Sequence, residues 1–380
     1  MDIRRNQSSS GFGRNQATSL AVAGILGAAW VGGTIAGQQK FDPKTGVSPR
    51  VATTALAATS TDVSWDLPNL DHNRVDFWVE QFTTSKRDQF RGFLERSGRY
   101  VPMISAKLEE RDMPQDLIYL AMIESGFNPT AYSAADASGL WQFIEETGER
   151  YGLTVNNVVD ERNDPVQATD AALDYLTYLH DRLGSWYLAA AGYNSGENRV
   201  ARIMEEVTGS ESGDDSDYYL IWDRLPRETR DYVPLMIAAA RIAKHPEKYG
   251  FEDVQIQPPM QYEQVPVDGG TPLAAVADAA GVDEESVEKL NPHFSLERTP
   301  TGKRSMVRIP AGTKTAFLVN WPTVREQQTY AATKYKIRRG DSLIAIARAH
   351  GVSVDAIRAE NDMRGSRIIA GRTLRIPSTG

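Results

Sequence analysis

The feature that most constrains this chain is a carboxylate at the end of an apolar run. Leu117, Leu120, Ala121 and Glu124 follow the i, i+3, i+4, i+7 spacing of one helix face. Burial on that face would raise the pKa of Glu124, giving a general acid that keeps its proton near neutral pH. Gly126 is expected to end the helix just after the carboxylate. On spacing alone, a helix-terminal glutamate in a surface salt bridge is the simpler interpretation.

Four further motifs follow Glu124 in order, and together they change that interpretation. They are Ser133, the block Gly139-Leu140-Trp141-Gln142, the pair Tyr193-Asn194, and Tyr232. Each is weak by itself, because a Tyr-Asn-Ser-Gly run is also an ordinary turn. In this order they resemble the lysozyme-like lytic transglycosylases of the SLT type, most closely the membrane-bound lytic murein transglycosylase D type. The resemblance covers roughly residues 71–251.

The resemblance implies an all-α domain and a reaction with one catalytic carboxylate. Glu124 would protonate the oxygen between N-acetylmuramic acid and N-acetylglucosamine, then take the proton of the C6 hydroxyl as a 1,6-anhydro ring closes. No water is consumed. Neutral donors and acceptors suit carbohydrate, and the residues expected to bind substrate or orient Glu124 are Ser133, Gln142, Tyr193, Asn194 and Tyr232. We expect Trp141 to pack in the core rather than to face sugar.

Asp136 departs from the family pattern, which more usually has glycine at this position. It adds a carboxylate near the expected cleft and keeps a hydrolytic muramidase of the goose-lysozyme kind as an alternative, because hydrolysis normally needs two carboxylates. Glu145 and Glu146 are expected to be solvated. Asp160 beside Arg162 predicts a structural ion pair.

Composition argues against several other classes of site. The five histidines are scattered and cysteine is absent, so we expect no metal and no cofactor. The net charge of −8 argues against nucleic acid as a partner. Without cysteine a lipoprotein anchor is not expected.

The N-terminal residues 1–37 read as an export signal. Arg4, Arg5 and Arg14 precede an uncharged, Ala- and Gly-rich stretch over 17–37. We favour a cleaved signal peptide, and a membrane anchor is the alternative. Residues 38–66, rich in Thr, Ala, Ser and Pro, predict a flexible linker. The bulk of the chain is therefore expected outside the cytoplasm, in the periplasm of a Gram-negative bacterium.

The C-terminal part contains an internal repeat with an offset of about seventy residues. Residues 334–380 show a strand-helix-helix-strand pattern with Gly340-Asp341-Ser342-Leu343 near its start, and they resemble a LysM domain. Residues 262–310 form a fainter LysM-like copy, in which Asn291 and Ile309 correspond to Asn361 and Ile376. Residues 311–333 are expected to link the two. The last copy is basic and the first acidic, so we expect the last one to bind glycan better.

The prediction is a multidomain α+β chain, with an all-α lysozyme-like domain over 67–252 followed by small βααβ modules. The expected partner is the glycan strand of peptidoglycan, with membrane association through 17–37 if that segment is kept. Two further alternatives remain: a wall-binding protein without activity, and a structural partner in a larger wall machine whose catalysis is secondary.

Overall fold

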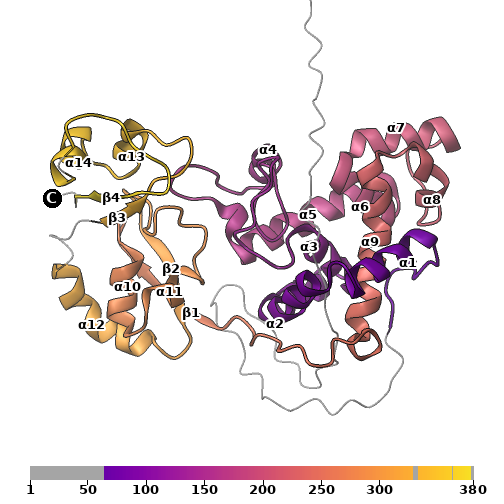
Figure 1. The fold of residues 1–380 in the computed structure, drawn as a ribbon, viewed down its shortest axis with the longest axis horizontal. Helices are drawn as coiled ribbons and strands as arrows, with labels where there is room; N and C mark the ends of the chain where they lie inside the picture. The colour runs from indigo at the N-terminus through magenta and orange to yellow at the C-terminus, as the bar shows by residue number, and fades with distance from the viewer. Residues whose placement is uncertain (1–63, 328–332, 362, 378–380) are drawn as a thin grey trace, which may run out of the picture.

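The computed structural model describes residues 64–327, 333–361 and 363–377 (Figure 1). The predicted export signal at 1–37 and nearly all of the predicted linker at 38–66 lie outside the described residues. Within these ranges, no helix is both long and apolar enough to cross a membrane.

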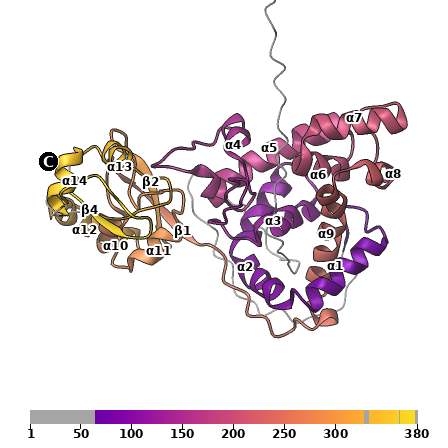
Figure 2. The same cartoon turned by 45° about the horizontal axis from the view of Figure 1, so that its top comes forward.

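The described chain forms a helical body followed by two small α/β modules (Figures 1 and 2). The main helices of the body are α1 (Asn73–Thr83), α2 (Arg87–Glu110), α3 (Ile118–Ser125), α4 (Glu145–Arg150), α5 (Pro165–Leu183), α6 (Trp186–Ser195), α7 (Glu197–Thr208), α8 (Asp217–Ile221) and α9 (Arg227–Lys244). The modules contain β1 (Tyr262–Val267), α10 (Leu273–Ala280), α11 (Glu284–Glu288), β2 (Ser305–Pro310) and α12 (Lys314–Gln327), then β3 (Thr333–Lys336), α13 (Leu343–Ala349), α14 (Val354–Glu360) and β4 (Thr373–Ile376).

Helix α3 is the centre of the helical body. It packs against α2 and α9, and all eight of its residues are buried. The sequence predicted one apolar face, but the segment Gln115–Leu117 forms a 3-10 turn and the helix behind it is enclosed on every side. A helix that is apolar all round belongs in a core. Glu124 is therefore more deeply buried than the i, i+3, i+4, i+7 spacing of one apolar face predicted.

Both ends of the body are fixed by polar contacts. The buried carboxylate of Asp116 accepts hydrogen bonds from the Asp66 and Leu67 amides at 2.8 and 3.1 Å, and it pairs with Lys244 at 2.6 Å. The segment after α9 runs along α2, where the Gln257 amide donates to the Glu95 carbonyl at 2.8 Å. These bonds tie the entrance and the exit of the domain to its core.

Each module contains one antiparallel strand pair. In the first, β1 pairs with β2 with Val265 opposite Val307; in the second, β3 pairs with β4 with Tyr335 opposite Leu374. The βααβ order matches the predicted repeat, and the predicted fold class, an all-α domain followed by βααβ modules, is confirmed.

The predicted linker over 311–333 is partly wrong. Helix α12 packs on α10 and buries Phe317, whose ring stacks on Trp321 at 5.1 Å between centroids. This helix completes the core of the first module. The sequence does not predict this helix because α12 has no clear apolar face. Leu318 and Val319 are exposed, and Pro322 lies inside the helix.

One glycine of the body gives a direct stability test. Gly139 has φ of +88°, and a Cβ atom there would lie 1.8 Å from the carbonyl oxygen of Arg162. Gly152 has φ of +86°, but nothing lies within 4 Å of its Cβ position. We predict that Gly152→Ala lowers the free energy of unfolding by about 1 kcal/mol, the strain of a left-handed alanine. Gly139→Ala should lower it by about 3 kcal/mol or more, because backbone must also move.

The measurement is urea denaturation followed by tryptophan fluorescence. Equal midpoints for the two variants would contradict the close approach of the Gly139 and Arg162 backbones.

Candidate functional site

The candidate site centres on the carboxyl group of Glu124 at the end of α3. The helix ends at Gly126, whose left-handed φ of +62° lets the chain turn away directly after the carboxylate. Glu124 is only 4% exposed. The turn is as predicted, and the surface salt bridge considered for this residue is excluded by the burial.

Tyr232 provides the direct partner of this carboxyl group. Its hydroxyl donates a hydrogen bond to Glu124 Oε1 from α9, which packs against α3. The structure thus brings together two predicted site residues that lie 108 positions apart in the sequence. Burial and the nearby Glu124 charge raise the pKa of Tyr232 well above its usual value, so it stays a donor.

The environment raises the pKa of Glu124 to about 8. Burial is the largest cause, because the charged form loses its hydration. The Tyr232 hydrogen bond acts in the opposite direction, and the negative charge of Glu228 adds to the increase. Glu124 is therefore protonated at neutral pH, as a general acid must be.

Glu228 is a site residue that the sequence analysis missed. It lies one turn before Tyr232 in α9, so both side chains project from the same face of that helix. It is half-buried, and its charge acts on Glu124. The i, i+4 spacing from Tyr232 was the available signal, but it becomes informative only once α9 is known to pack on α3.

The loop over 131–143 forms another wall of the site. The Gln142 side-chain amide donates to the carbonyls of Ala131 and Gly139 at 3.1 and 2.9 Å, and Gln142 has a left-handed φ of +49°. Tyr193 donates from its hydroxyl to the Trp141 carbonyl at 2.8 Å. Gln142 and Tyr193, both predicted site residues, thus meet at this loop.

Trp141 belongs to the core, as predicted. It is fully buried, and its indole N–H donates to Thr169 Oγ1 of α5 at 2.9 Å. Ser125 adds a second tie, because its hydroxyl donates to the Leu140 carbonyl at 2.8 Å. The loop is therefore anchored to both α3 and α5.

Ser133 and Asn194 form bonds within the protein. The Ser133 hydroxyl oxygen accepts from the Ala135 and Ala137 amides at 3.2 and 3.1 Å, which closes a turn. Asn194 accepts from Thr229 at 2.7 Å, linking α6 to α9. Both contacts hold the walls of the site, and the predicted contacts of these two side chains with sugar stay predictions.

Asp136 differs from Glu228 in its surroundings. It is exposed, its carboxylate accepts from the Tyr132 hydroxyl at 2.6 Å, and its φ is +60°. The left-handed backbone explains why glycine suits this position. Asp136 is not among the groups that shift the pKa of Glu124, whereas Glu228 is. If a second carboxylate acts, Glu228 is the better candidate.

The remaining carboxylates are as expected. Glu145 and Glu146 are exposed. Arg162 is buried and pairs with Asp160 at 2.8 Å.

Among the described residues, Glu284, Glu288 and Glu297 of the first module bring oxygens within 4.8 Å of one another. Acidic surface groups often approach so closely without an ion, and we assign no metal to them.

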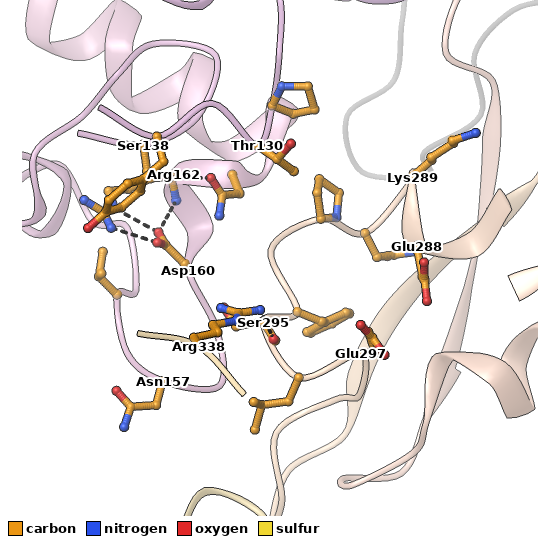
Figure 3. A pocket seen from close by; sticks show the side chains of 18 of the residues that line it. Thr130, Ser138, Asn157, Asp160, Arg162, Glu288, Lys289, Ser295, Glu297 and Arg338 are labelled. Carbon is orange, nitrogen blue, oxygen red and sulfur yellow. Dashed lines mark hydrogen bonds and ion pairs between the residues drawn. The ribbon is translucent and has the colours of Figure 1, made fainter. Parts of the chain in front are cut away.

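A separate groove of about 1250 Å³ lies between the helical body and the two modules. Figure 3 shows Thr130, Ser138, Asp160 and Arg162 on one side and Glu288, Lys289 and Glu297 on the other. Glu124 does not line this groove. Its walls combine polar side chains with apolar ones such as Leu273, Phe294 and Leu296, and it is distinct from the site around Glu124.

Comparison with known proteins matches three segments to described families. Residues 102–214 match the transglycosylase SLT domain, residues 261–325 the LysM-like domain of lytic transglycosylase MltD, and residues 335–377 the LysM domain. The first match contains Glu124, Ser133, Gln142, Tyr193 and Asn194.

Two named relatives agree with these matches. Membrane-bound lytic murein transglycosylase D of Escherichia coli K12 is 32% identical over 292 residues, covering 74% of this chain and 64% of the relative's length. Membrane-bound lytic murein transglycosylase C of Haemophilus ducreyi is 25% identical over 168 residues, covering 40% of this chain and 43% of the relative.

Among solved structures, the soluble lytic transglycosylase SLT70 of Escherichia coli aligns with a TM-score of 0.35 and 22% identity. That alignment covers 47% of this chain and 29% of SLT70. The chain thus carries, in order, matches to a transglycosylase SLT domain and two LysM-type modules, and it resembles membrane-bound lytic murein transglycosylase D over 74% of its length.

Proposed function

We propose that this protein is a peptidoglycan lytic transglycosylase. It cleaves the bond between N-acetylmuramic acid and N-acetylglucosamine without water and leaves 1,6-anhydromuramoyl ends. The observation that carries the proposal is the buried Glu124, protonated up to about pH 8 and hydrogen-bonded to Tyr232. The match to the SLT domain and the resemblance to transglycosylase D support it.

In the proposed reaction Glu124 acts twice. Its proton passes to the glycosidic oxygen as the bond from that oxygen to C1 breaks, and the substrate N-acetyl group assists the departure. Glu124 is then a carboxylate in a site that disfavours charge, so it readily takes the proton of the C6 hydroxyl while O6 bonds to C1. The enzyme ends in its starting protonation state, which is why one carboxylate suffices.

The other site residues divide between orientation and binding. Tyr232 holds Oε1 of Glu124 and directs the acid proton toward the substrate side. Gln142 donates both side-chain amide hydrogens to carbonyls of the loop. Its side-chain carbonyl oxygen is then the group that can accept a hydrogen bond from a sugar hydroxyl or amide. Ser133, Tyr193 and Asn194 complete the proposed sugar-binding wall.

The last module is proposed to hold the enzyme on the wall. The match to the LysM domain supports glycan as its ligand. Ile344 and Ile369 are 72% and 49% exposed in this module, beside polar loop residues, and such a mixture suits the faces and hydroxyls of sugars. We place the protein in the periplasm of a Gram-negative bacterium, exported by residues 1–37, with membrane attachment if that segment is retained.

Glu228 is the observation that favours a second candidate, a hydrolytic muramidase. Two carboxylates near one bond are the usual arrangement for activating water. In that case Glu228 would serve as the base that activates water. Asp136 is too exposed for this role.

Replacing Glu124 tests the proposed function. We predict that Glu124→Gln abolishes release of soluble fragments from purified peptidoglycan, because the amide cannot donate the proton. Removal of a single catalytic acid typically costs about 10²- to 10⁴-fold in rate. The parent and Glu124→Asn should be assayed beside it, and wild-type rates in the glutamine variant would refute the assignment.

The same variant should be more stable than the parent, which separates lost catalysis from misfolding. The folded protein keeps the Glu124 proton up to about pH 8, whereas an unfolded chain releases it near 4.5. The folded state therefore loses stability as pH rises between these values, by up to about 3 kcal/mol at pH 7. Glutamine removes this penalty. Urea midpoints at two pH values measure the effect, and a lower midpoint for Glu124→Gln would contradict it.

The pH profile tests the role of Tyr232. Activity should fall as pH rises through about 8, because the acid form of Glu124 is lost. The Tyr232 hydrogen bond lowers the pKa of Glu124, so Tyr232→Phe should move this basic limb upward, by about one pH unit, while reducing the maximal rate. Tyr178→Phe, at an exposed position, serves as control. A limb that stays in place or moves down would contradict the assigned hydrogen bond.

Truncation tests the division of labour between modules. A chain ending at Gln327 should lose most of its co-sedimentation with insoluble peptidoglycan but still cleave short soluble glycans. Local anchoring typically adds about 10²- to 10⁴-fold to the avidity of a weak site. Unchanged sedimentation would show that the first module or the cleft carries wall binding.

A further inference from the structure

The first module is joined to the helical body by a buried ion pair. Arg308 on β2 donates two parallel hydrogen bonds to Asp164, from Nη1 to Oδ2 at 2.7 Å and from Nη2 to Oδ1 at 2.9 Å. Asp164 is fully buried and Arg308 is 6% exposed. Asp164 also caps α5 by accepting from the Val166 and Gln167 amides at 2.9 and 3.1 Å. A buried charge needs a partner of this quality, so each domain depends on the other here.

The internal repeat provides a matched comparison for Arg308. In the first module Asn291 donates to the Arg308 carbonyl, and in the last module Asn361 makes the same bond to the Arg375 carbonyl. Arg308 and Arg375 are thus equivalent positions. Arg375 is a surface residue, with its side chain 65% exposed and paired with Glu360 at 2.8 Å. The arginine at this equivalent position lies on the surface in the last module, whereas in the first module it forms a bond between domains.

Backbone contacts extend the junction beyond the ion pair. The Asp160 amide donates to the His293 carbonyl, and the Ser295 amide donates to the Val158 carbonyl, both at 2.9 Å. Phe294 and Val159 are buried in a shared apolar cluster. Most residues over 290–299 of the connection between α11 and β2 are therefore buried, whereas its counterpart between α14 and β4 is exposed over 364–367 and 369–372.

Segment 158–164 also contacts the 131–143 loop. Arg162 donates from Nη1 to the carbonyls of Asp136 and Phe143 at 2.8 and 3.2 Å. Ser138 donates from its hydroxyl to Asn163 Oδ1 at 2.7 Å. Gly139 lies directly against the Arg162 backbone. Segment 158–164 thus contacts both the module and the loop that carries Gln142.

We infer that the first module braces the 131–143 loop through segment 158–164, with Arg308 and Asp164 as positioning residues for the site at Glu124. Its role is to hold the site in shape, while the last module holds the wall. The docking part stands on the contacts alone. The effect on catalysis rests on the proposed transglycosylase function.

Hydrogen exchange of the full chain tests the brace without any assay of activity. In Arg308→Met and in Asp164→Asn, amides of 131–143 and 158–164 should exchange about tenfold faster than in the parent. Asparagine caps helices as well as aspartate, so the second variant removes the charge and keeps the cap. Arg375→Met, the equivalent change in the last module, should leave both segments unchanged. Exchange in α2 and α9 should not change in any variant, which excludes global unfolding.

Kinetics on a short soluble glycan then test the positioning role. The value of kcat/KM should fall about tenfold in Arg308→Met and Asp164→Asn, because misplacing a site by small distances is costly. Co-sedimentation with insoluble peptidoglycan should match the parent in both. Arg375→Met should keep the parent value of kcat/KM.

The outcomes separate the two claims. Exchange in 131–143 that is equal in Arg308→Met and Arg375→Met would overturn the brace, as would faster exchange confined to 158–164. Faster exchange in both segments together with unchanged kcat/KM would overturn the positioning role. A third outcome is faster exchange in both segments of the variants while the parent protein itself cleaves no glycan. That result would support the brace and count against the proposed function.

Discussion

The hydrogen bond from Tyr232 to Glu124 is the interaction on which the site depends. It links α9 to α3 inside the helical body, where both side chains are buried. Burial raises the pKa of Glu124, and the hydrogen bond that Tyr232 donates to the carboxylate partly reverses that increase. The proposed chemistry needs both, because the same group must release a proton and later recover it. Two opposed environmental effects thus produce one group that works in both directions near neutral pH.

The rest of the body holds this pair in place through layers of contact. The 131–143 loop is tied to α3 through Ser125, to α5 through Trp141 and to α6 through Tyr193. Behind the loop lies segment 158–164, and behind that the first module. Few of these residues need to touch substrate. Their effect is to limit the movement of a small number of polar groups around Glu124, which is what precise catalysis requires.

The sequence predicted what local pattern and ordered motifs encode. Glu124 was found because an isolated carboxylate on an apolar helix is unusual, and Trp141 was recognised as core. The ion pair of Asp160 with Arg162 follows from adjacency, and the two βααβ modules follow from their repeat. Each of these features depends on residues that are close in sequence or on a pattern that recurs.

The missed features depend on tertiary packing. Glu228 belongs to the site only because α9 packs on α3. Helix α12 has little amphipathic pattern and is recognisable only once Phe317 is seen against α10. Arg308 and Asp164 are 144 positions apart, and each looks like an ordinary surface charge in the sequence. The substrate contacts of Ser133, Gln142, Tyr193 and Asn194 stay predictions.

The most direct test of the central claim is to run the reaction of residues 64–380 with purified peptidoglycan in water labelled with oxygen-18. Mass spectrometry of the released fragments then reports whether water enters the products. One carboxylate acting first as acid and then as base predicts anhydromuramoyl ends that contain no label. Reducing ends that carry one labelled oxygen would contradict this single-carboxylate reaction and would show that water attacks the substrate, with Glu228 as the first residue to replace in the search for the base.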